Sequence, residues 1–181
     1  AGALVAAAPD HLAGLTGGPH PVASVGRPGS ALPGDELAQY DYTVRLPAGW
    51  RHSGGEPERR RTLLTPSDTP LGSDLISVEQ TPLGYDSAAE PDRAFRELRD
   101  RYEQARRDGS ELADLTPSTR VGGRDVIAYR QRRPARDTRV DWYVVFDGDA
   151  QLSVGCQHTT VGEATVREAC AVVVGSLRLR R

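Results

Sequence analysis

Two cysteines and one histidine near the C-terminus are the residues whose types and spacing could do chemistry. Cys156 and Cys170 are the only cysteines, and His158 follows Cys156 by two residues. Residues two apart on a strand share a face, so Cys156 and His158 could form the thiolate–imidazole pair of a cysteine nucleophile. Such neighbours stand about 7 Å apart, however, and this cysteine lies among aliphatic residues. The pattern therefore favours a structural role for Cys156.

A disulfide between Cys156 and Cys170 is the prediction that follows. Cys156 shares the apolar face of a predicted strand with Leu152 and Val154, and Cys170 lies on the apolar stripe of the predicted last helix. If that helix packs on the sheet, a bridge is sterically easy and should stabilise the fold by about 3 kcal/mol. Disulfides persist in oxidising compartments, so we expect an extracytoplasmic domain.

Three aspartates are the candidates for acid–base chemistry. Asp141, Asp147 and Asp149 could supply the paired carboxyl groups of a glycoside hydrolase. Asp147 and Asp149 flank Gly148, however, in a sequence typical of a turn, where aspartate side chains bond to the backbone. A structural role for these aspartates is therefore the preferred interpretation.

Sequence motifs of other catalytic sites are absent. The chain contains no Lys, which excludes a P-loop, and no serine-hydrolase, zinc-protease or dinucleotide-binding motif. The four histidines are scattered along the chain, at His11, His20, His52 and His158. We therefore expect no enzyme activity, no metal site and no cofactor.

Arginines and one tryptophan form the candidate interaction surface. A net charge of −2 with 27% charged residues gives no sign of nucleic-acid binding. Local arginine runs could instead be plain solvated surface, or could bind an acidic protein or anionic lipid head groups. Trp50 and Trp142 could each anchor an interface, although Trp142 reads as a core residue. The candidate surface residues are Trp50, Arg59, Arg60, Arg61, Arg132, Arg133 and Arg136.

Residues 1–38 form a predicted linker or membrane-proximal segment, followed by a single domain at 39–181. The segment holds five prolines and seven glycines without a strand or helix period, so it buries too little apolar surface to fold alone. Its first eight residues could be the tail of a transmembrane helix or an Ala-rich linker, and are too few to cross a bilayer. Because residue 1 is not Met, we expect a piece of a longer protein.

Alternating and helical patterns indicate an α+β domain. Strands with a period of two occur before and after a helix that begins near Pro91 and ends near Gly109, and a second helix is predicted at 163–177. This order predicts a twisted, mainly antiparallel sheet of six or seven strands flanked by helices. Residues 51–61 read as a loop. The predicted strands are 40–46, 61–65, 74–80, 112–119, 124–132, 139–147 and 151–158.

The order of several motifs resembles the C-terminal domain of actinobacterial type VII secretion-associated proteins. The motifs are Tyr42-Thr-Val-Arg-Leu-Pro-Ala-Gly-Trp50, Gly123-Arg124-x-Val126-x-x-Tyr129, Val140-Asp-Trp-Tyr-Val-Val145, Gln151-Leu-Ser-Val-Gly-Cys-Gln157 and Ala169-Cys170. The first of them is also similar to PsbP-like domains. This resemblance implies a PsbP-like fold and a single-pass membrane protein, with a cytoplasmic part absent from this chain and this domain outside the membrane.

Three functions follow as expectations. The leading one is a non-catalytic extracytoplasmic interaction module of a type VII secretion accessory protein. It would bind a protein of the membrane complex or a secreted substrate, and an upstream helix outside this chain would tether it to the membrane. The alternatives are a small-molecule or lipid-binding domain of the cell envelope and, third, an envelope hydrolase.

Overall fold

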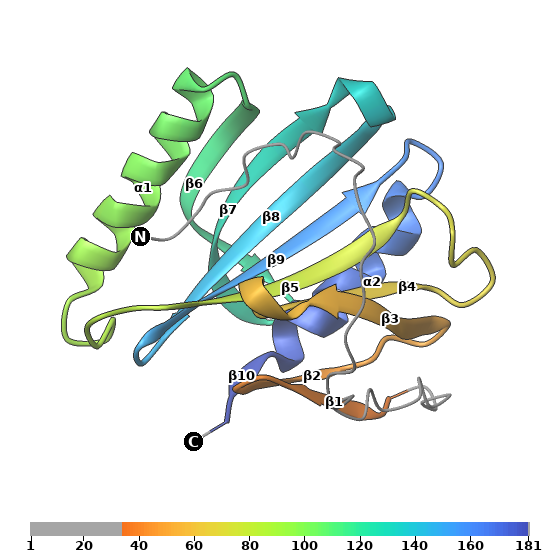
Figure 1. The fold of residues 1–181 in the computed structure, drawn as a ribbon, viewed down its shortest axis with the longest axis horizontal. Coiled ribbons are helices and arrows are strands. Elements are labelled where there is room, and N and C mark those ends of the chain that lie inside the picture. Colours follow the sequence, from red (N-terminus) through yellow and green to blue (C-terminus); the bar gives the residue numbers. More distant parts are fainter. Residues whose placement is uncertain (1–33, 181) are drawn as a thin grey trace, which may run out of the picture.

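The computed structural model describes residues 34–180. Most of the predicted linker, including the Ala-rich first eight residues, lies outside the described residues. The described chain forms two α-helices, ten strands and two short 3-10 helices (Figure 1). The elements are β1 Glu36–Gln39, β2 Tyr42–Arg45, β3 Trp50–Glu56, η1 Pro57–Arg59, β4 Arg61–Pro66, β5 Leu75–Pro82, α1 Pro91–Arg107, β6 Glu111–Val121, β7 Arg124–Arg133, η2 Pro134–Arg136, β8 Thr138–Asp147, β9 Ala150–His158, α2 Glu163–Ser176 and β10 Arg178–Leu179.

Antiparallel pairing joins seven strands into one large sheet in the order β3-β4-β5-β9-β8-β7-β6. A second sheet has three strands in the order β1-β2-β10. Figure 1 shows α2 behind the large sheet and α1 beside β6 at one edge of it. The prediction of an α+β domain with a twisted, mainly antiparallel sheet flanked by helices is therefore confirmed.

The period of two along each strand gives the large sheet two different faces. The face toward α2, here called the α2 face, carries Leu152, Val154 and Cys156 of β9, which pack with Val166 and Val173 of α2. The opposite face, here called the α1 face, is apolar where it meets α1. Its apolar part is a second core, formed by Leu98, Tyr102, Ala105, Leu112, Tyr129, Val140, Trp142 and Val144.

The disulfide between Cys156 and Cys170 is present and ties β9 to α2, as predicted. The two Cα atoms are 6.2 Å apart, within the usual range for a bridge, and both cysteines are buried in the main core. A disulfide is typical of proteins in oxidising compartments, which supports a place outside the cytoplasm. Among the described residues, neither helix has the length and apolar character needed to cross a bilayer.

The structure contradicts the prediction for one segment and contains two short strands, β1 and β10, that were not predicted. The predicted loop at 51–61 is wrong over residues 51–56, because Trp50–Glu56 forms β3, pairs with β4 and contains a bulge between His52 and Gly54. It reads as a loop because an edge strand exposes most of its side chains, and only Trp50 is buried. Strand β1 includes residues 36–38, which the sequence assigned to the linker, and the two-residue β10 also pairs with β2.

Candidate functional site

The cysteine-nucleophile interpretation fails because Cys156 is held in the disulfide. His158 is buried on the α2 face, where its Nδ1 lies 3.1 Å from the carbonyl oxygen of Thr159. Its Nε2 lies 3.5 Å from the Asp141 carboxylate. These contacts give His158 a packing role beside the disulfide.

The three candidate aspartates are distributed along β8 and its following turn. Asp141 and Asp147 are six residues apart on one strand, which separates them by about 20 Å at about 3.3 Å per residue. A glycosidase pair needs about 5–10 Å, so these two residues cannot form one. Asp147, Gly148 and Asp149 belong to the β8–β9 turn, whose backbone carbonyls accept hydrogen bonds from Leu83 and Ser87. No group of three or more metal-binding side chains gathers among residues 34–180.

Trp50 does not belong to a surface, which corrects its place in the predicted interaction site. Its side chain is 6% exposed and packs in the core between the large sheet and α2. The register pairs Trp50 with Pro66, so it shares the α2 face with Leu64. Its indole is therefore unable to anchor a partner without unfolding of β3.

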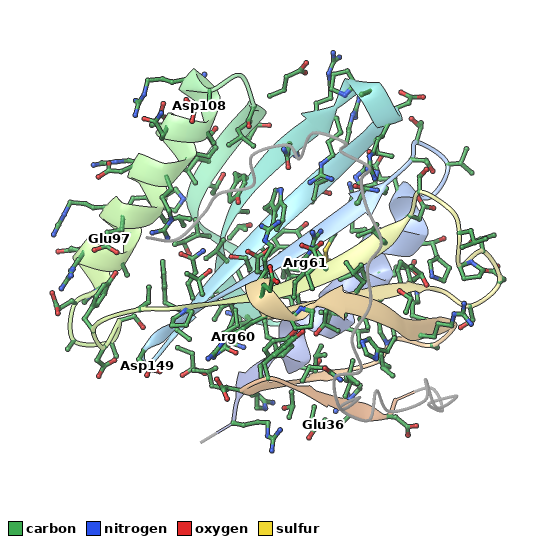
Figure 2. All side chains as sticks on the ribbon, in the orientation of Figure 1. Glu36, Arg60, Arg61, Glu97, Asp108 and Asp149 are labelled. Carbon is green, nitrogen blue, oxygen red and sulfur yellow. A yellow bond between two sulfur atoms is a disulfide. The ribbon has the colours of Figure 1, made fainter. Side chains whose placement is uncertain are left out.

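Each predicted arginine run spans part of a strand and a short 3-10 helix or its cap, so its members do not share one surface. Arg60 Nη1 lies 2.6 Å from the Asp41 carboxylate, near the small sheet, and Arg132 Nε lies 2.7 Å from the Glu111 carboxylate. Arg59 bonds to Glu79. Figure 2 shows Arg61 over the middle of the large sheet and Arg60 nearer to the small sheet. Neighbours in the sequence thus have different surroundings.

Arg61, Arg133 and Arg136 come together from the two runs, and are here called the arginine cluster. Burial lowers the pKa of Arg133, and the charges of Arg61 and Arg136 lower it further. Arg133 donates to a neutral acceptor, Oε1 of Gln157, at 3.2 Å. Within the described chain, Arg136 is exposed and makes no ion pair, and the buried Nε of Arg61 has no hydrogen-bond partner. Among residues 34–180, Glu56 is the one carboxylate that forms an ion pair with a member of this cluster, at 2.9 Å from Arg61.

A cleft opens on the α1 face between α1 and the sheet, and no sequence motif predicted it. Its cavity volume is about 40 Å³, and its mouth is open to solvent. One wall is apolar and aromatic and the other is polar. Its lining residues are Glu79, Thr81, Arg101, Ala105, Ser110, Leu112, Tyr129, Gln131, Trp142, Gln151 and Ser153.

Hydrogen bonds fix the polar wall of this cleft. Arg101 donates to Oε1 of Gln151, and Nε2 of Gln151 donates to Oγ of Ser153 at 2.9 Å. On the other side, Nε1 of Trp142 donates to Oε1 of Gln131 at 3.1 Å. Each polar side chain is therefore held in one orientation.

Two stacked rings form the aromatic wall of the cleft. Tyr129 and Trp142 have ring centroids 6.0 Å apart and an interplanar angle of 17°. Trp142 lies against Gly155 of β9, where a Cβ would stand 2.8 Å from the indole ring. The missing side chain at Gly155 lets the indole approach the strand backbone. Tyr102 of α1 meets the Tyr129 ring edge-on, with centroids 5.5 Å apart.

Most cleft residues lie in strands or in a helix that were predicted, although their role was not. One feature of the sequence could have pointed to the cleft. Gln151, Ser153 and Gln157 are polar and alternate with the apolar side chains of β9, which is buried along its whole length. A strand that is apolar on one face and polar on the other, yet buried on both, indicates a covered polar surface. Arg101 and Tyr129 carry no such signal in the sequence.

Comparisons with known proteins give structural neighbours only. No family model and no curated protein matches the chain. The chain is similar to a crystal structure from Bacteroides thetaiotaomicron VPI-5482, with 13% identity and a TM-score of 0.49, over 78% of this chain and 46% of that one. It is also similar to the solution structure of cyanobacterial PsbP (CyanoP) from Synechocystis sp. PCC 6803, with 14% identity and a TM-score of 0.48, over 86% of this chain and 98% of that one.

A PsbP protein is thus among the structural neighbours. The chain spans less than half of the Bacteroides protein and nearly all of the cyanobacterial one. At these identities the similarities carry no information about ligands, partners or secretion.

Proposed function

We propose that this domain is a non-catalytic extracytoplasmic module that binds an acidic segment of a partner protein through the arginine cluster. The observation that carries the proposal is the gathering of Arg61, Arg133 and Arg136 with one carboxylate, Glu56, beside them. Three guanidinium groups repel one another, and carboxylates from a partner would relieve that repulsion. Their planar, forked donors also suit bidentate bonds to carboxylates.

The resemblance to type VII secretion-associated proteins supports a candidate for that partner. We propose a protein of the type VII membrane complex or one of its secreted substrates, with the domain tethered outside the membrane by an upstream helix. The disulfide agrees with that compartment.

Charge reversal tests the proposal directly. We expect Arg133→Glu/Arg136→Glu to weaken binding to an extracytoplasmic component of the secretion complex by at least about tenfold, because opposed charges are replaced by like charges. Titration calorimetry or surface plasmon resonance would measure it. Raising the salt concentration should weaken the wild-type complex and have less effect on the variant.

Arg120→Glu is the matched control. Arg120 is an exposed arginine of β6 whose nearest carboxylate is Asp125, at 3.8 Å, and it lies outside the cluster. Its reversal should leave binding unchanged. Equal losses from both variants would indicate a general charge effect and contradict a specific site. Retention of anionic vesicles with no retention of any secretion component would contradict a protein partner.

A further inference from the structure

The cleft between α1 and the sheet goes beyond the proposed partner surface, since it shares no residue with the arginine cluster. Its central feature is Tyr129, which is only 5% exposed. Its hydroxyl makes no hydrogen bond to any part of the chain that the structure describes, although its ring packs against Tyr102 and Trp142. The hydroxyl oxygen is not among the fully enclosed polar atoms that lack a partner, so it is open to an added molecule.

The hydroxyl of Tyr129 is directed into the cleft rather than into the core. The two charged side chains that act on it are Glu79 and Arg101, which both line the cleft. Burial raises the pKa of Tyr129 well above its ordinary value, so the hydroxyl keeps its proton and remains a donor. An unpaired donor therefore faces an open space.

The other polar groups of the cleft are also left with unused donors. Gln131 accepts from Trp142 through Oε1, which leaves its amide N–H groups available. Ser153 accepts from Gln151, which leaves its hydroxyl hydrogen available. Arg101 has further N–H groups beyond its bond to Gln151. The one carboxylate of the lining, Glu79, is bound by both oxygens to Arg59 at 3.2 and 3.3 Å.

This inventory defines the chemistry of a complementary ligand. Donors from Arg101, Tyr129, Gln131 and Ser153 require acceptors, and a carboxylate supplies acceptors with the charge opposite to Arg101. A sugar fits less well, because its hydroxyl groups would need free acceptors as well as donors. The remaining walls, from Ala105, Leu112, Tyr129 and Trp142, suit an apolar or aromatic body.

We propose that this cleft is a binding site for a small organic carboxylate with an apolar or aromatic body, whose carboxylate accepts hydrogen bonds from Tyr129, Ser153 and Arg101. Benzoate is the simplest probe of this class. Benzyl alcohol has a similar body without the charge, and acetate has the charge without the body.

Tyr129→Phe is the most direct test of the proposed site. We expect benzoate to bind the full chain saturably, at millimolar concentration or below, and more tightly than benzyl alcohol or acetate, as measured by ligand-observed NMR or calorimetry. Tyr129→Phe should weaken benzoate binding by at least about tenfold, because it removes a hydrogen bond to a charged group. The melting temperature of the variant should stay equal to or above that of the wild type, because the hydroxyl has no partner in the free protein.

Tyr143→Phe is the matched control, because Tyr143 lies on the α2 face of β8 and outside the cleft. It should leave benzoate binding unchanged. The proposal is overturned if benzoate shows no saturable binding, or if benzyl alcohol or acetate binds as well as benzoate. It is also overturned if Tyr129→Phe binds benzoate like the wild type, or melts at a clearly lower temperature.

Discussion

Replacing both bridged cysteines, in Cys156→Ala/Cys170→Ala, is expected to lower the free energy of unfolding by about 3 kcal/mol. The bridge closes a loop between residues 14 apart, and its loss restores conformational entropy to the unfolded chain. For a chain of this size, the melting temperature should fall by about 6–12 °C. Urea unfolding followed by circular dichroism and by the fluorescence of the buried tryptophans measures the change.

Reduction of the wild type provides the control for this prediction. Protein that is unfolded, reduced and refolded under a reducing agent should unfold at the same urea concentration as the double variant, while the variant itself should not respond to the reducing agent. Both cysteines are buried, so reduction of the native protein should be slow and require opening of α2 from β9. Identical unfolding midpoints for oxidised and reduced wild type would contradict a stabilising role of the bridge.

The elements with strong periodicity could be predicted from the sequence. Helix α1 buries Leu98, Tyr102 and Ala105, which recur at helical spacing, and its start at Pro91 follows the preference of proline for the first turn. Strands β7, β8 and β9 alternate clearly because each has one face in a core. The disulfide could be predicted from these assignments, because Cys156 lies on the apolar face of a strand and Cys170 on the apolar side of the helix that packs on it.

The short strand β10 could not be predicted, because pairing with a distant strand creates it. Strands β1 and β10 both pair with β2, although β10 lies more than 130 residues further along the chain. The backbone hydrogen bonds that define β10 depend on where the C-terminal segment returns, and a local pattern contains no such information. Strand β3 was missed for a different reason, because it lies at an edge of the large sheet and is mostly polar.

The candidate site was only partly predictable, because residues in one run face different directions. The sequence grouped Arg59, Arg60 and Arg61 as one surface, whereas the structure pairs Arg60 with Asp41 and places Arg61 with Arg133. The cleft was even harder to predict. The Tyr129 hydroxyl points to a binding site only because it has no hydrogen-bond partner in the described chain, and the sequence contains no information about that. Ordinary residues form this site by convergence from α1 and five strands.

A single methyl group at Gly175 is expected to destabilise the fold by about 2 kcal/mol. Gly175 lies in α2, where its Cα packs directly against the β6–β7 turn, and a Cβ would overlap the carbonyl oxygen of Gly122. Gly122 approaches equally closely, since its own Cβ would overlap the carbonyl oxygen of Ala171, and its φ is +58°. Backbone thus meets backbone, and neither side can move by a rotamer change alone.

The sign of this effect makes Gly175→Ala a sharp test, because alanine in an open helix would stabilise by about 1 kcal/mol relative to glycine. Gly84→Ala is the matched control, since nothing lies within 4 Å of its Cβ position and its φ is not left-handed; it should change stability little. Urea unfolding of both variants gives the comparison. If Gly175→Ala is as stable as the wild type, the close packing of α2 on the turn is wrong. Because β6 and β7 carry Leu112, Tyr129 and Gln131, displacement of this turn should also weaken benzoate binding in the cleft.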